Sequence, residues 1–239
     1  YKDLGTDALR KNIDTILLKL ENVDVTVDSE KQTYFALDEF LKKDFSVYWL
    51  CLKYFTRGDL YWLCSSFKGG KTDIINYLIR SIVYSNEFLG YPTIKGKVLF
   101  YNTEEGAISL KIKASNHGFD HDDILQELED SKSVIIGRSL DLVGQFNEFE
   151  RKAREIKPVL IVLDTVRSVM SRSGLDERQV EFANIFYRVQ SLAVELNCTI
   201  ICCHHLTGEG KLSSTKALYG IGAGTIILTS NKQENTTRL

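Results

Sequence analysis

A run of small and cationic residues has the composition of a phosphate-binding loop. Residues 65–72 read Ser-Ser-Phe-Lys-Gly-Gly-Lys-Thr, and loops that cradle phosphates follow the pattern G-x-x-x-x-G-K-[ST]. Gly70, Lys71 and Thr72 close this pattern, whereas Ser65 occupies the position of its first glycine. An apolar, β-prone segment precedes the run, and apolar residues recur at helical spacing after it. Because the pattern requires this strand–loop–helix order, the run predicts a nucleotide site.

Each part of the loop has its own task in holding a triphosphate. Backbone N–H groups and the N-terminus of the following helix would bind the phosphates. Lys71 would reach the β- and γ-phosphates, and the Thr72 hydroxyl would ligate Mg²⁺. Ser65 is small enough to suit a tight turn, and Lys68 adds a second cation. A glycine-rich turn that binds nothing is the alternative. The residues expected to contact the nucleotide are Ser65, Ser66, Phe67, Lys68, Gly69, Gly70, Lys71 and Thr72.

Polar residues also end three apolar strands elsewhere in the chain. Asp164 ends "PVLIVLD" and has the place of the carboxylate that holds the Mg²⁺ shell, unless it caps a buried strand. Glu104 ends "VLFYNTE" and would orient or activate the attacking water, while Glu105 would begin the next helix and favour its dipole. His205 ends "NCTIICCHH" and would hydrogen-bond the γ-phosphate, with a capped or core histidine as the alternative. We therefore expect catalytic roles for Lys71, Glu104 and His205.

The elements that must position these residues alternate along the chain from residue 58 onward. Apolar runs predict strands over residues 59–64, 97–102, 133–137, 158–164, 198–203 and 224–229. Helical periodicity predicts helices over residues 71–88, 106–117, 121–130, 142–156 and 178–196. Such alternation predicts an α/β fold, with a mainly parallel twisted sheet and helices on both faces. Its ligand site would lie beyond the carboxyl ends of the strands.

This pattern divides the chain into two segments. Residues 46–239 form the expected nucleotide-binding domain, and residues 1–45 precede it as a helix and linker. Apolar residues at helical spacing predict an amphipathic helix over residues 6–21, followed by a polar linker or an exposed hairpin. This N-terminal segment would either serve as an arm that packs on the next subunit of an assembly or cover its own domain.

Composition excludes some classes of protein but indicates no further binding site. The 239 residues carry a net charge of −2, so contacts with nucleic acid must come from local patches. No apolar run approaches the roughly 18 residues that span a bilayer, and we expect a cytoplasmic protein with no membrane partner. The five cysteines favour buried thiols in a reducing compartment. In the run "CCHH" at residues 202–205, successive strand residues point to opposite faces and cannot converge on one zinc ion.

The order of these motifs resembles the RecA-like ATPase superfamily. The resemblance is greatest to the RepA-type hexameric helicases and the related plasmid and phage ATPases, an AAA-labelled RecA-like family. Residues 67–72 resemble that family's phosphate loop, PK-x-GK-[ST]. The family has a Glu at the end of its second strand, as at Glu104, and an hhhhDT strand, as at Asp164-Thr165. Its sensor strand ends in His-His, as at His204-His205. The resemblance covers about residues 45–239. It implies ATP and Mg²⁺ as cofactors, ATP hydrolysis, and a homo-oligomeric ring or filament with ATP at the subunit interfaces.

Two further features follow from the resemblance. Such families insert a cationic finger into a neighbour's site; here Lys232 and Arg238 are the late cations, and the identity of the finger stays open. Their channel loops contact single-stranded DNA, and the matching places are residues 167–178 and 206–216. Neither loop has an aromatic residue for base stacking. The cations expected to contact DNA phosphates are Arg167, Arg172, Lys211 and Lys216.

The function expected from these features is motor work on DNA: a helicase, or an ATPase of replication or recombination. The alternative is an ATP-switched regulatory or scaffold protein that acts on a protein partner without unwinding DNA. A guanine-specific site is disfavoured, because residues 231–234 read N-K-Q-E where GTPases have N-K-x-D. Asp164 also lacks the D-x-x-G continuation of those proteins.

Overall fold

The computed structural model describes residues 36–42, 47–175, 179–207, 216–231 and 236–238. The chain divides into two compact units, Tyr1–Phe45 and Ser46–Leu239. In the first unit the described element is the short helix α2 (Leu37–Lys42). The helix predicted over residues 6–21 lies outside the described residues. The arm role of residues 1–45 therefore stays a prediction.

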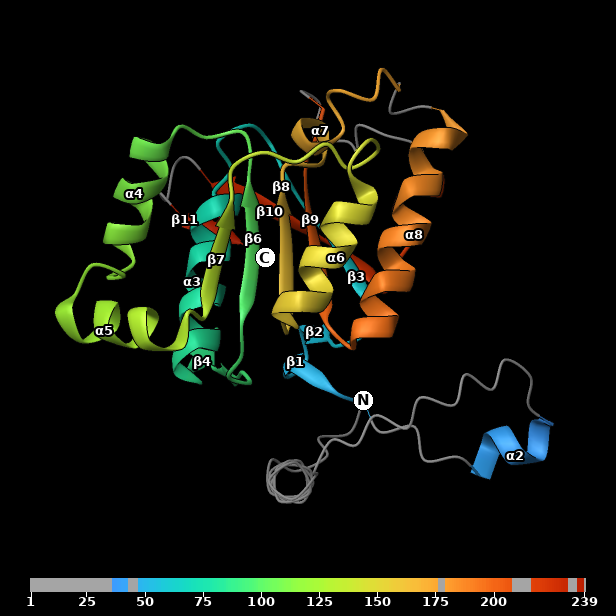
Figure 1. Cartoon of the computed structure of the whole chain (residues 1–239), viewed down its shortest axis with the longest axis horizontal. Coiled ribbons are helices and arrows are strands. Elements are labelled where there is room, and N and C mark those ends of the chain that lie inside the picture. The colour runs from blue at the N-terminus through green and yellow to red at the C-terminus, as the bar shows by residue number, and fades with distance from the viewer. Residues whose placement is uncertain (1–35, 43–46, 176–178, 208–215, 232–235, 239) are drawn as a thin grey trace. The chain divides into compact units, whose positions relative to one another are not determined.

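The second unit is built on a seven-stranded sheet with the order β11-β10-β3-β9-β8-β6-β7 (Figure 1). Six of its strands are parallel, and β11 at one edge pairs antiparallel with β10. The strands are β3 (Leu60–Ser65), β6 (Val98–Asn102), β7 (Val134–Gly137), β8 (Leu160–Asp164), β9 (Thr199–His205), β10 (Gly224–Asn231) and β11 (Thr236–Arg238). Two small hairpins flank it: β1 (Trp49–Cys51) with β2 (Phe55–Thr56), and β4 (Glu87–Phe88) with β5 (Tyr91–Pro92).

Helices cover both faces of this sheet (Figure 1). They are α3 (Lys71–Tyr84), α4 (Ala107–Asn116), α5 (Asp122–Ser131), α6 (Phe146–Ile156), α7 (Val166–Val169), α8 (Val180–Leu196) and α9 (Lys216–Tyr219). The predicted α/β fold with a mainly parallel sheet is thus what the structure contains.

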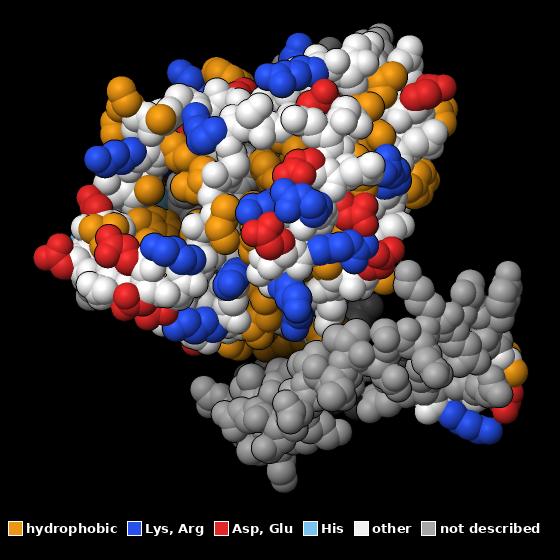
Figure 2. All heavy atoms as spheres, viewed as in Figure 1, with side chains coloured by type: hydrophobic (Ala, Val, Ile, Leu, Met, Phe, Trp, Pro, Cys, Tyr) orange, Lys and Arg blue, Asp and Glu red, His pale blue; other side chains and the backbone are white. Residues whose placement is uncertain are grey.

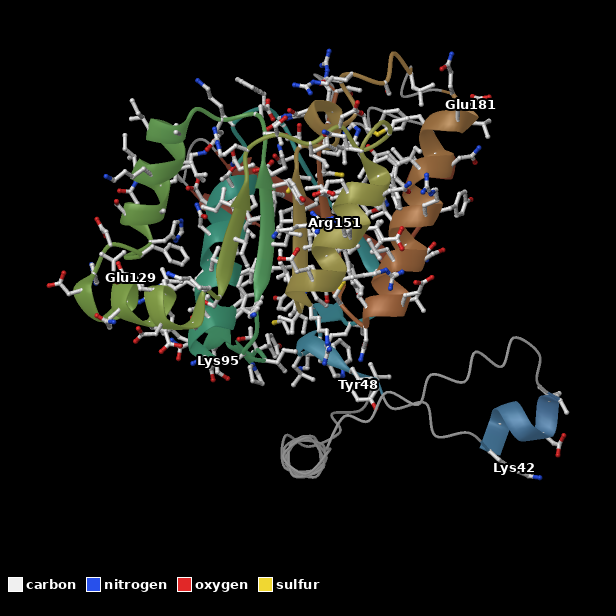
Figure 3. All side chains as sticks on the ribbon, viewed as in Figure 1. Lys42, Tyr48, Lys95, Glu129, Arg151 and Glu181 are labelled. Carbon is white, nitrogen blue, oxygen red and sulfur yellow. The ribbon has the colours of Figure 1, made fainter. Side chains whose placement is uncertain are left out.

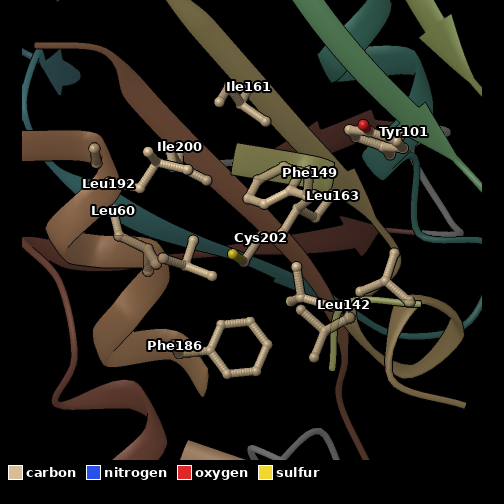
Figure 4. Close-up of a cluster of buried hydrophobic side chains, with 14 of the residues drawn as sticks. Leu60, Tyr101, Leu142, Phe149, Ile161, Leu163, Phe186, Leu192, Ile200 and Cys202 are labelled. Carbon is tan, nitrogen blue, oxygen red and sulfur yellow. The ribbon is translucent and has the colours of Figure 1, made fainter. Parts of the chain in front are cut away.

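Alternate residues of each inner strand serve two separate apolar cores, because strand side chains point to opposite faces in turn. In β3, Trp62 faces a first core. This core includes Phe149 of α6 and Phe186 of α8 (Figure 4). The neighbour of Trp62, Leu63, faces a second core that includes Leu78 of α3. Burial on both faces explains why the predicted strands read as continuous apolar runs rather than as alternating ones.

Two helix predictions were wrong at one end. The helix predicted over residues 71–88 ends at Tyr84, where Ser85 takes a left-handed conformation with φ 53°. The chain then turns into the β4–β5 hairpin, from which Phe88 packs into the second core. Apolar periodicity continued through Phe88, so the sequence pattern did not mark the end of the helix. The helix predicted over residues 142–156 begins only at Phe146, because Asp141 accepts the amides of residues 143 and 144 in a turn.

Parallel pairing brings four strand ends to one edge of the sheet. Ser65 at the end of β3 pairs with His205 at the end of β9, and Asn102 at the end of β6 pairs with Asp164 at the end of β8. The residues after these ends include the phosphate loop and Glu104. The topology therefore assembles the chemically active residues from four separate parts of the chain.

Gly222 packs against the backbone of β3, and substitutions there test this close contact. Gly222 has φ +97°, and an added Cβ would lie 2.2 Å from the carbonyl oxygen of Leu60. Gly90 has a similar φ of +80°, with nothing within 4 Å of an added Cβ. We expect Gly90→Ala to cost about 1 kcal/mol of unfolding free energy, from backbone strain alone. Gly222→Ala should cost more than about 3 kcal/mol, because strain and overpacking add. Equal losses for the two variants in urea unfolding would contradict this packing.

Candidate nucleotide site

The position of the missing first glycine does not require a glycine. Ser65 is the last residue of β3, fully buried, and it pairs with Leu228 on one side and His205 on the other. Its backbone is therefore extended, a conformation that any residue adopts. The left-handed residues of the loop are instead Lys68, with φ 57°, and Gly70, with φ 85°. A serine at position 65 is compatible with the loop for this reason.

Ser65 was predicted to contact the nucleotide; in the structure its side chain is fully buried and binds Lys71. Its hydroxyl lies 3.1 Å from the Lys71 Nζ, which donates to it, and donates in turn to the Ser66 carbonyl at 2.8 Å. A Cβ at Gly69 would lie 2.7 Å from both the Cβ and the Oγ of Ser65. Gly69 therefore allows the loop to fold closely over this serine.

Lys71 and Thr72 are the first residues of α3, and both side chains are buried. The Lys71 Nζ also lies 3.2 Å from Nδ1 of His205, and Nε2 of the same ring lies 3.4 Å from a carboxylate oxygen of Glu104. An ammonium group can only donate, so Nδ1 accepts from Lys71 and the ring proton is on Nε2, facing Glu104. The three residues predicted to be catalytic thus form one hydrogen-bonded chain, Lys71–His205–Glu104.

Asp164 is the last residue of β8, with 3% of its surface exposed. The Thr72 hydroxyl donates to it at 3.0 Å. The pKa of Asp164 is raised from 3.8 to about 6, mainly because the carboxyl is buried. The Thr72 hydrogen bond and the Lys71 charge oppose this rise, and the charges of Glu104 and Glu105 add to it. The apoprotein therefore holds a carboxylate that lacks full compensation for its charge.

One cavity of about 600 Å³ is lined by most of the predicted site residues, although Ser65 and Ser66 do not line it. The predicted residues that do are Phe67, Lys68, Gly69, Gly70, Lys71, Thr72, Glu104, Asp164 and His205. Three lysines and four carboxylates line it: Lys68, Lys71, Lys113, Asp73, Glu104, Glu105 and Asp164. A triphosphate would meet net repulsion from such a lining unless a cation accompanied it. A hydroxyl and a buried carboxylate are the hard oxygen ligands that Mg²⁺ prefers. Thr72 and Asp164 therefore fit a magnesium ion, with Asp164 acting directly or through water.

The two neighbouring glutamates differ in their surroundings. The Glu104 side chain is 41% exposed and points to His205. Glu105 forms an ion pair with Lys113 through one carboxylate oxygen, while its other oxygen is buried without a hydrogen-bond partner among the described residues. The predicted start of a helix at Glu105 is nearly right, since Gly106 is the N-cap of α4. Sequence reasoning missed Ser109 and Lys113 as lining residues, although their spacing of four places both on one helix face.

The two histidines of the sensor strand have different environments. His204 is buried and packs between the rings of Trp62 and Tyr219, with centroid distances of 6.4 and 5.9 Å. His205 emerges at the strand end and lines the cavity. The amide of Leu206 donates to the Ser65 carbonyl at 2.8 Å, which continues the ladder past His205 and fixes its backbone beside the phosphate loop.

The predicted DNA-contacting residues lie partly outside the described structure. Arg167 belongs to the short helix α7 and Arg172 to the turn after it, and both are exposed. Lys211 and the side chain of Lys216 lie outside the described residues. The prediction of a loop over residues 167–178 was wrong at its start, because residues 167–169 belong to α7. Thr165 caps this helix by accepting a hydrogen bond from the Ser168 amide. Figure 2 shows Lys and Arg side chains along the upper edge, where α7 lies in Figure 1.

The five cysteines are free and buried. Burial raises the pKa of the Cys64 thiol to about 11 and that of Cys51 to about 12, so neither forms a thiolate near neutral pH. None of the described helices is both long and apolar enough to cross a bilayer.

Comparison with known proteins gives one family match and a similar solved structure. The AAA_25 family, described as an AAA domain, has a model that matches residues 29–211. No curated protein matches the chain. Among solved structures, a KaiC-like protein from the hyperthermophilic archaeon Pyrococcus horikoshii is similar, with 19% sequence identity, a TM-score of 0.58 and coverage of 79% of each chain. At this identity the similarity concerns the fold, and the predicted RecA-like α/β fold is confirmed.

The buried Asp164 carboxylate leads to a prediction about stability. Its raised pKa means that the charge destabilises the folded protein above about pH 6. That cost falls as the pH decreases from about 6 toward 4, because only the folded state then binds the proton. We expect Asp164→Asn to raise the melting temperature of the nucleotide-free protein by about 5 °C at pH 8. The difference should narrow toward pH 5.

Differential scanning calorimetry over this pH range measures the effect. Asp130→Asn is the matched control, since Asp130 is exposed and contacts Gln126 on its own helix. An Asp164→Asn protein that melts below the wild type at pH 8 would show that the carboxylate is stabilising in the folded state, contrary to this account.

Proposed function

The chain belongs to the AAA domain family and is a P-loop ATPase with a RecA-like fold; on this premise we propose that it couples Mg²⁺-dependent ATP hydrolysis to work on single-stranded DNA, as RepA-type helicases do. The observation that carries the proposal is the convergence of Lys71, Thr72, Asp164, Glu104 and His205 on one cavity. These residues come from three strand ends and one helix N-terminus. Their types match the needs of phosphoryl transfer to water.

The loop and Lys71 bind the triphosphate. The start of α3 lines the cavity, so its free backbone N–H groups and the positive end of the helix dipole would bind the phosphates. Lys71 is buried beside these groups and would shift from Ser65 and His205 to the phosphate oxygens. Thr72 and Asp164 would hold the Mg²⁺ ion, which would supply positive charge to the bound phosphates.

Glu104 is the proposed general base or water-positioning group. Its carboxylate reaches the cavity from the end of β6, and its neighbour His205 keeps the ring N–H directed toward it. Binding of a γ-phosphate at Lys71 removes the donor that His205 Nδ1 accepts from in the free protein. His205 would then sense the phosphate and transmit its loss to the chain that follows, residues 206–216.

Two connections link this site to DNA. Arg167 follows Asp164 by three residues, and residues 206–216 follow His205 directly. Each proposed DNA loop therefore continues a strand that ends in a site residue, so a change at the phosphate would move both loops. The proposal includes a homo-oligomeric ring or filament in which these loops line a channel and a neighbour supplies the cationic finger.

A second candidate function is an ATP-switched scaffold that binds a protein partner. The observation that favours it lies on α4, the helix that follows the two glutamates. Ile108 and Ile112 are 79% and 56% exposed there, and they lie one helical turn apart on one face. Exposed apolar side chains next to a nucleotide site suit a protein contact that the nucleotide regulates.

The roles of the loop lysine and the two glutamates can be separated by single substitutions. We expect Glu104→Gln to bind MgATP normally and to lower kcat by about 10² to 10⁴-fold, because the base or positioning group is lost. Glu105→Gln, its matched neighbour, should lower kcat much less. Lys71→Ala should remove the rise in melting temperature that saturating MgATP gives the wild type. Normal turnover by Glu104→Gln together with a large loss in Glu105→Gln would transfer the role to Glu105.

DNA binding is testable by its dependence on salt. We expect a fluorescent single-stranded oligonucleotide to bind, with an affinity that falls as salt rises, and to stimulate ATP turnover. Arg167→Ala and Arg172→Ala should each reduce the slope of log K against log salt by about 0.7. Arg151→Ala on the outer face of α6 is the control (Figure 3). No retention of the oligonucleotide at low salt, with turnover unchanged by it, would favour the scaffold function.

A further inference from the structure

The position of Glu104 depends on the backbone that carries it. Its side chain is 41% exposed, and its carboxylate lies 3.4 Å from Nε2 of His205. Side-chain contacts of this kind do not fix a reacting group closely. The turn of residues 102–105, between β6 and α4, must therefore hold Glu104 in place.

Arg138 binds both ends of this turn. One terminal nitrogen of its guanidinium, Nη1, donates to the Asn102 carbonyl at 2.9 Å and to the Asn102 side-chain oxygen at 3.1 Å. The other, Nη2, donates to the carbonyl of Glu105. Glu104 lies between these two attachment points, so the guanidinium sets the distance across the turn that contains it.

The remaining contacts of the turn support the same geometry. The Thr103 amide donates to the Asp164 carbonyl at 2.9 Å, and the Glu105 amide donates to the Asn102 side-chain oxygen at 3.3 Å. That Asn102 oxygen accepts from Arg138 as well, so the arginine also orients the group that caps the turn. The Glu105–Lys113 ion pair holds the turn from the side of α4.

Sheet register explains how Arg138 reaches the turn. Gly137, the last residue of β7, pairs with Tyr101 of β6. The residues that follow these two, Arg138 and Asn102, are therefore neighbours. A Cβ at Gly137 would lie 2.2 Å from the Tyr101 ring. The glycine leaves room for that ring, which belongs to the first core, and the two strand ends can then stay in contact.

We propose that Arg138 is a positioning residue for hydrolysis, which holds the 102–105 turn so that Glu104 meets the attacking water. This inference rests on the proposed ATPase function and on the role of Glu104. Arg138 is not among the residues that line the cavity, so it acts through the turn and not through the nucleotide. A planar guanidinium binds two separated acceptors at fixed geometry, which a lysine ammonium does not do.

Steady-state kinetics on Arg138→Met and Arg138→Lys test the proposal. We expect kcat to fall about ten-fold in both variants, since small displacements of a reacting group reduce rates strongly. KM for ATP, the affinity for a fluorescent ATP analogue with Mg²⁺ and the melting temperature should stay close to the wild type. Arg151→Met is the matched control, because Arg151 is exposed and pairs with Glu148 and Glu155 on its own helix.

Two further measurements separate positioning from a general loss of structure. In a Glu104→Gln background, Arg138→Met should lower kcat by less than two-fold, because both changes remove the same step. Hydrogen exchange at the amides of Thr103 and Glu105 should be faster in Arg138→Met than in the wild type, without nucleotide present.

Each outcome decides the proposal. A kcat for Arg138→Met within two-fold of the wild type overturns it, and so does a parallel loss of nucleotide affinity and melting temperature. The proposal is also overturned if Arg138→Met lowers kcat as much in the Glu104→Gln background as in the wild type. If the wild type does not hydrolyse ATP, the proposed function fails; hydrogen exchange then still shows whether Arg138 holds the turn, and unchanged exchange in Arg138→Met overturns that as well.

Discussion

Burial of the Asp164 carboxylate beside the Thr72 hydroxyl is the constraint around which the site is built. The 3.0 Å hydrogen bond between them joins the end of β8 to the start of α3. Ordinary folding would avoid an ionised carboxylate with 3% exposure. Its raised pKa indicates that the buried charge lowers the stability of the folded protein above about pH 6. A cation bound there would remove that cost and would make the site suitable for a triphosphate.

The remaining polar contacts extend from this point across the edge of the sheet. Lys71 links the phosphate loop to Ser65 and His205, and His205 links it to Glu104. Lys71 is attached to the N-terminus of α3 and His205 to the end of β9. Glu104 lies instead in the 102–105 turn, which leaves the sheet between β6 and α4. Its contacts with Arg138 replace the support that a strand would give.

The two faces of the sheet contribute in different ways. Helices α6 and α8 close the first core, and their outer surfaces carry interspersed charges, including Arg151 and Arg154 with glutamate partners (Figures 2 and 3). Helix α4 on the other side buries only Leu110 among its residues and exposes Ile108 and Ile112. A fully packed helix cannot respond to a ligand without disturbing the core. Helix α4 next to Glu105 is packed sparsely, so it can move with less disturbance of the core.

Local patterns in the sequence determined much of the fold and the membership of the site. Continuous apolar runs marked the buried parallel strands, and Gly70-Lys71-Thr72 marked the loop, because these signals depend on neighbours in the chain. The predicted end of α3 and the predicted start of α6 were wrong. The apolar spacing continues past both points, but the chain leaves the helix at the left-handed Ser85 and forms a turn at Asp141 before α6. Tertiary structure alone decided that Ser65 is extended, that His205 bridges Lys71 and Glu104, and that Arg138 reaches Asn102. Those contacts join residues far apart in sequence, and only strand register places them together.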